Sequence, residues 1–95
     1  MTPLYEALLD RARRNPGGEA MRSAIEMAGK VPDTWPLLIA ALGQIPEADA
    51  PTKLPLELAI VGKGRPDVEA LLDRWEKSTT PALRKAVQAV RKSGG

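Results

Sequence analysis

The stretch Glu6-Ala7-Leu8-Leu9-Asp10-Arg11 recurs letter for letter as Glu69-Ala70-Leu71-Leu72-Asp73-Arg74. Exact internal repetition is typical of proteins built from duplicated structural units. The repeat continues downstream, because Ala20-Met21-Arg22 aligns with Ala82-Leu83-Arg84 once the intervening loop is shortened. A weaker third copy lies between them, where Pro32-Asp33 and Leu37-Leu38 match Pro66-Asp67 and Leu71-Leu72. The sequence therefore predicts three units, at residues 3–31, 32–64 and 65–93.

Each unit carries the start and stop signals of two helices. Thr2-Pro3 and Thr80-Pro81 place a capping hydroxyl before a proline, which is well tolerated in the first turn of a helix. Apolar residues then recur at three- and four-residue spacing, and alternating strand patterns are absent. The predicted fold is all-α, with six helices paired as three antiparallel αα-hairpins. The predicted helices lie near residues 3–14, 19–30, 34–44, 53–62, 67–77 and 81–92.

Composition limits the classes of protein and site that the chain can represent. At 95 residues with 43% hydrophobic and 27% charged residues, we expect a single domain over 1–95, with a flexible tail at 93–95. The chain has no Cys and no His, which excludes disulfides and thiolate or imidazole metal sites, and we expect no cofactor. The longest apolar run, residues 36–43, is too short for a membrane span, and no leader pattern opens the chain. We expect a soluble, cytoplasmic protein.

The last helix carries a resemblance to a known family. Residues 81–94 read PALRKAVQAVRKSG, which is similar to the second helix of short HEAT repeats: an apolar residue, Arg, small or apolar positions, then a Gly stop. The middle unit departs from the pattern, with Pro55 where the others have Arg22 and Arg84. The resemblance implies a HEAT-like repeat stack that acts as a scaffold for protein contacts. The alternative is a compact six-helix bundle, death-fold-like in size and helix count.

The middle unit is apolar where the outer units are polar. Its first helix carries Trp35, Ile39 and Leu42, and its second helix carries Leu56 in place of Ser23 and Lys85. At the positions of Trp35, Ile39 and Leu42, the outer units carry charged residues instead. These are Glu6, Asp10 and Arg13 in the first unit and Glu69, Asp73 and Glu76 in the last. One interpretation is burial of both helix faces within a bundle. The other is an exposed groove, formed by Trp35, Ile39 and Leu42, for a partner helix or a second copy of the chain.

A second candidate site is basic. Net charge is only +2, but Arg84, Lys85, Arg91 and Lys92 form two stacked pairs on the last helix. Such a stripe can neutralise phosphates, which makes nucleic-acid binding the alternative function. The competing interpretation is structural, since cations late in a helix complement its dipole.

Catalysis finds little support in the sequence. The candidate acid–base groups are carboxylate pairs at i, i+4, Glu6 with Asp10 and Glu69 with Asp73, and both have cationic neighbours in sequence. We therefore expect no enzyme. The expected function is that of a protein-interaction or adaptor module, using Trp35, Ile39, Leu42 and Leu56. Its expected partner is another protein or a second copy of the chain, with nucleic acid as the alternative and no membrane.

Overall fold

The structure is a computed structural model that describes residues 2–94, and every regular element in this range is helical. The α-helices are α1 (Thr2–Arg14), α2 (Glu19–Lys30), α3 (Trp35–Gln44), α4 (Leu54–Val61), α5 (Pro66–Glu76) and α6 (Pro81–Gly94). Two short 3₁₀ helices, η1 (Pro32–Thr34) and η2 (Glu47–Asp49), precede α3 and α4. The predicted all-α fold with six helices is thus confirmed.

The largest difference from the predicted helix ends is at α6. The sequence predicts an end at residue 92 and a flexible tail over 93–95, whereas the helix continues to Gly94. Glycine disfavours the interior of a helix but adopts helical angles at its last position, so Gly94 does not force an earlier stop. The remaining residue of the predicted tail, Gly95, lies outside the described residues.

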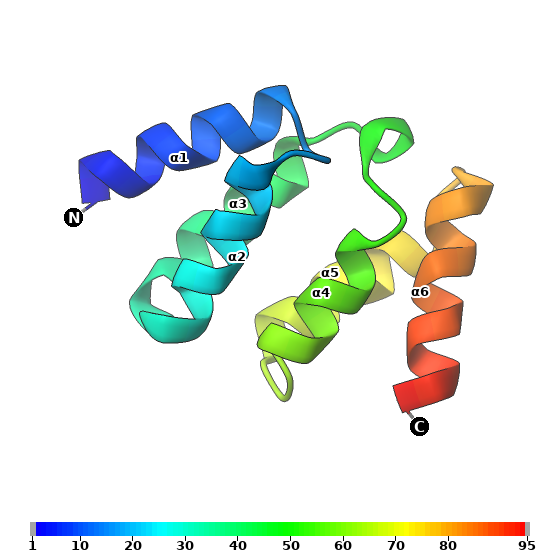
Figure 1. Cartoon of the computed structure of the whole chain (residues 1–95). Helices are drawn as coiled ribbons and strands as arrows, with labels where there is room; N and C mark the ends of the chain where they lie inside the picture. Colours follow the sequence, from blue (N-terminus) through cyan, green and yellow to red (C-terminus); the bar gives the residue numbers. More distant parts are fainter. Residues whose placement is uncertain (1, 95) are drawn as a thin grey trace. The chain divides into compact units, whose positions relative to one another are not determined.

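The helices group into two compact units, residues 1–45 and 46–95. Figure 1 shows the chain coloured from blue at α1 to red at α6. In the first unit α1 packs on α2, and α3 contacts both. In the second unit α6 packs on α5 and α4. The boundary falls inside the predicted middle unit, 32–64, so neither compact unit contains both helices of the predicted middle hairpin.

The core of the first unit consists of the apolar stripes that the helical spacing predicts. Its buried side chains come from all three helices, and they include Tyr5, Leu9, Ala12, Met21, Ile25, Ala28, Trp35, Leu38, Ala41 and Leu42. One buried polar atom joins two of these helices, because the Tyr5 hydroxyl on α1 donates a hydrogen bond of 2.9 Å to the Ala24 carbonyl on α2. Apolar packing and the buried Tyr5–Ala24 hydrogen bond therefore both hold this unit together.

The second unit combines an apolar core with polar anchors on its loops. Its buried side chains include Leu54, Leu58, Val68, Leu71, Leu72, Trp75, Leu83 and Val87. The loop before α4 is fastened by Glu47, whose Oε1 accepts a 2.6 Å hydrogen bond from the Ser78 hydroxyl and whose Oε2 lies 3.7 Å from the Arg74 Nε. This ties η2 to the end of α5.

The turn between α4 and α5 depends on a glycine. Gly64 has a φ of +83°, a region that side chains with a Cβ rarely adopt. The Arg65 amide closes the turn on the Gly62 carbonyl at 3.1 Å, and Pro66 then starts α5. None of the helices in residues 2–94 has both the length and the apolar character needed to cross a bilayer.

Candidate functional site

The structure places the predicted apolar site residues in two different environments. Trp35 and Leu42 are buried, with 2% and 0% of their surface exposed, and Ile39 is half-buried. Of the two interpretations of this face, burial is confirmed for Trp35 and Leu42, and the exposed groove of Trp35, Ile39 and Leu42 is wrong. The reason is that the apolar face of α3 packs on α1 and α2 instead of facing solvent.

Leu56, the remaining predicted residue, lies on an open face of α4. Its side chain is 48% exposed, and the next turn adds Ile60 at 67%. On the opposite face of the same short helix, Leu54 and Leu58 are buried. The pair therefore leaves apolar surface open on a helix whose other face already fills the core of the unit.

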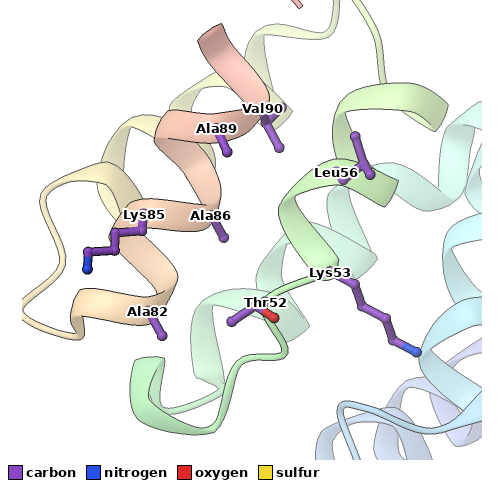
Figure 2. Close-up of a pocket in the computed structure, with 8 residues that line it drawn as sticks. All are labelled: Thr52, Lys53, Leu56, Ala82, Lys85, Ala86, Ala89 and Val90. Carbon is purple, nitrogen blue, oxygen red and sulfur yellow. The ribbon is translucent and has the colours of Figure 1, made fainter. Parts of the chain in front are cut away.

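Leu56 borders a hollow between α4 and α6, which we call the α4–α6 groove. Its apolar walls are Leu56, Ala82, Ala86, Ala89 and Val90, and its volume is about 430 Å³. Figure 2 shows Ala86, Ala89 and Val90 pointing toward α4. The alanines follow one another at i, i+4 and i+7, so they form a single shallow face along α6. Because the side chains on this face of α6 are small, they leave one side of Leu56 uncovered. The surface of the groove is therefore apolar.

Two lysines flank the groove. Lys53 precedes the first residue of α4, and Lys85 lies on α6, where it points away from α4 (Figure 2). A second hollow of about 760 Å³ shares Leu56 and Val90 with the first and continues past Ile60 to Lys63. Within residues 2–94, none of these three ammonium groups has a carboxylate within ion-pair distance.

The residues of the predicted basic stripe also lie in two different environments. Arg84 donates a 3.2 Å hydrogen bond to the carbonyl of Ser78, which lies in the loop between α5 and α6. Arg91 faces three carboxylates of α5: its Nη2 lies 2.6 Å from Asp73 and 3.4 Å from Glu69, and its Nε lies 3.3 Å from Glu76. Lys85 and Lys92 are exposed. The structure therefore does not present four free cations along α6, because both arginines interact within the unit.

Three of the four carboxylates in the predicted i, i+4 pairs form ion pairs with arginines. Asp10 on α1 accepts ion pairs from Arg13 at 3.3 Å and from Arg14 at 2.9 Å. In the second unit Glu69 and Asp73 share Arg91. Asp10, Glu69 and Asp73 thus belong to ion pairs at the helix surface, whereas Glu6 is exposed and has no ion pair among the described residues.

The first unit has an apolar pocket of its own. It measures about 350 Å³ and is lined chiefly by Leu4, Leu8, Met27, Val31 and Leu37. Two hydroxyls reach its wall, but Tyr5 donates to Ala24 and Thr34 donates to the Val31 carbonyl at 2.8 Å. The carboxylate of Asp33 also lines the pocket, and it is exposed and forms no ion pair among the described residues.

Sequence reasoning missed the α6 wall of the groove. Ala82, Ala86 and Ala89 are the commonest kind of helix residue, and nothing in their spacing separates a groove wall from an ordinary helix surface. A signal was available on α4, where Leu56 and Ile60 add a second apolar pair opposite Leu54 and Leu58. No family model, curated protein or solved structure matches the chain. The HEAT-like resemblance thus stays a prediction.

Proposed function

We propose that this chain is a protein-interaction module that binds a partner through the α4–α6 groove. The main observation behind this proposal is that Leu56 is exposed beside an apolar hollow, in a unit whose core is already filled. Large apolar side chains left open next to a concave surface are typical of binding sites, and a buried anchor in such a pocket contributes much of the binding energy.

The shape of the groove favours a helical segment as the bound element. An amphipathic helix presents apolar side chains at i, i+4 and i+7, which is the spacing of the alanines that form the α6 wall. Because alanine side chains are small, such a helix can approach closely and place larger side chains against Leu56. The proposed role is thus that of an adaptor that captures a short amphipathic segment.

Selection from a displayed library of random peptides of about 15 residues tests this function. Peptides enriched on the wild-type protein should bind Leu56→Glu at least about tenfold more weakly, because the substitution puts a charge at the centre of the apolar contact. The matched control is Leu4→Glu, which makes the same change at an exposed leucine of the first unit. Both variants should melt like the wild type. Enrichment of only peptides that bind Leu56→Glu equally well contradicts the proposal.

A further inference from the structure

We infer that the occupant of the α4–α6 groove is an amphipathic helix of a partner protein that carries acidic residues beside its apolar face. This inference rests on the proposed function and adds the chemical class of the partner. Three properties of the second unit support it: the length of the groove, the lysines that flank it, and the pairing of the unit's own acidic residues.

The groove is long enough for two turns of a bound helix. From Ala82 to Ala89 the α6 wall extends about 10 Å, at 1.5 Å per residue. On the α4 side the two hollows meet at Leu56 and Val90, so the apolar surface continues to Ile60. A partner helix of about three turns can therefore contact the groove along its length, with Leu56 near the middle.

The charge around the groove is positive and uncompensated. Lys53, Lys63 and Lys85 border the two hollows without ion-pair partners among the described residues. The acidic residues of the second unit are mostly committed to arginines: Glu47 to Arg74, Asp67 to Arg65, and Glu69, Asp73 and Glu76 to Arg91. Three of the five lysines of this unit therefore border the apolar groove, and complementary charges determine which partner associates fastest and most specifically.

The same charges disfavour two other occupants. A second copy that docked groove against groove would bring its own Lys53 and Lys85 toward their counterparts, and like charges across an interface oppose association. Nucleic acid would set phosphates against a surface whose centre consists of Leu56 and the alanines of α6, which donate no side-chain hydrogen bonds. An acidic amphipathic helix satisfies both the apolar centre and the basic flanks.

A matched set of synthetic amphipathic peptides tests the inference on the full chain. All members share leucines at i, i+4 and i+7, and their flanking positions carry Glu, Gln or Lys. By fluorescence anisotropy at low salt, the Glu peptide should bind about tenfold more tightly than the Gln peptide, with the Lys peptide weakest. This preference should shrink as salt screens the lysines.

Charge reversal supplies the decisive comparison. In the Lys53→Glu, Lys85→Glu double variant the Lys peptide should become the tightest binder. The control double variant, Lys30→Glu with Lys77→Glu, changes net charge equally at exposed sites outside the groove and should keep the acidic preference. Equal binding of all three peptides, or equal effects of both double variants, overturns the acidic partner while leaving the groove as a binding site.

Two further outcomes are separable in the same samples. If no peptide distinguishes the wild type from Leu56→Glu, the proposed function itself fails. Sedimentation equilibrium showing a dimer that Leu56→Glu dissociates would replace the acidic helix with a second copy of the chain. A DNA duplex that displaces the Glu peptide and binds more tightly would likewise overturn the inference.

Discussion

At the scale of single residues, the Tyr5 hydroxyl shows how a polar atom is accommodated in an apolar core. It donates to the Ala24 carbonyl at 2.9 Å, and this bond links α1 to α2. Burial raises the pKa of Tyr5 above its ordinary value, so the hydroxyl keeps the proton that it donates. The helical spacing places Tyr5 on the core stripe, but spacing alone does not identify a backbone carbonyl as its acceptor.

Tyr5→Phe should therefore destabilise the protein although the ring is kept. The substitution removes a buried hydrogen bond between two helices, which contributes about 0.5–1.5 kcal/mol, while the Ala24 carbonyl keeps its place in the backbone ladder of α2. Urea denaturation followed by circular dichroism measures the change in the free energy of unfolding. An unchanged denaturation midpoint would show that water replaces the hydroxyl at this carbonyl.

A second residue-scale prediction concerns acid stability. The Arg65 guanidinium beside Asp67, at 3.0 and 3.1 Å, lowers the pKa of that carboxyl. The folded state thus resists protonation of Asp67, and this contribution is present above the unfolded pKa of about 3.9 and is lost as pH falls through the lower folded pKa. Asp67→Asn should make the free energy of unfolding fall less between about pH 5 and about pH 2 than it does in the wild type.

The expected size of that effect is below about 1 kcal/mol, because both side chains are about a third exposed and solvent screens the pair. The control is Asp49→Asn, an exposed carboxylate with no ion pair among the described residues. Its acid sensitivity should match that of the wild type. Identical curves for both variants would contradict a stabilising role for the Arg65–Asp67 pair.

At the scale of elements, the sequence of α4 shows two apolar faces but does not indicate which of them is buried. It is apolar on two faces, and the structure fills one face and leaves the other open. A helix that is apolar all round is usually buried, and α3 follows that rule whereas α4 does not. The sequence could not separate the two cases, because burial depends on which helices pack against each face.

The two faces of α4 allow one substitution to be compared at two sites. Leu58→Ala removes a fully buried side chain and should lower the free energy of unfolding by about 2–5 kcal/mol. Leu56→Ala removes an exposed one and should change it by less than about 0.5 kcal/mol. Thermal or urea denaturation of both variants beside the wild type provides the measurement. Comparable destabilisation by the two substitutions would place Leu56 in a packed environment and remove the groove.

At the scale of the whole molecule, charge is distributed unequally between the two compact units. Residues 1–45 contain five basic and five acidic residues, and residues 46–95 contain nine basic and seven acidic residues. Counting charges in the sequence locates the excess at the C-terminal end. Counting does not reveal that Arg84 and Arg91 interact within their own unit, since Arg84 bonds to the loop before α6 and the packing of α6 on α5 brings Arg91 to its carboxylates.

Nucleic-acid binding should consequently be weak. With Lys85 and Lys92 as the free cations of α6 in the described structure, α6 should contribute no more than about −2 to the slope of log affinity against log salt. Fluorescence anisotropy with a labelled DNA duplex measures the slope, and Lys85→Gln with Lys92→Gln should nearly abolish the contribution of α6. A slope near −4 that also falls on Arg91→Gln would show that phosphates compete successfully with the carboxylates of α5.

The outline of the fold was accessible from the sequence, and the grouping of its helices was not. Prolines and apolar spacing are local signals, so they locate helices such as α5, which begins at Pro66, within a residue. The sequence alignment pairs α3 with α4, yet these helices belong to different compact units. Which helices share a core depends on contacts between distant segments, and the exposed groove predicted on α3 was wrong for this reason.

The anchoring of Glu47 determines where the second unit can be separated from the rest of the chain. Helix α4 starts only at Leu54, which makes that residue the obvious first position for a fragment or a graft onto another protein. A cut there would remove the acceptor of the buried Ser78 hydroxyl and the carboxylate beside Arg74. For segmental labelling or domain transplantation, Pro46 is therefore the better junction, and η2 should travel with the helices that follow it.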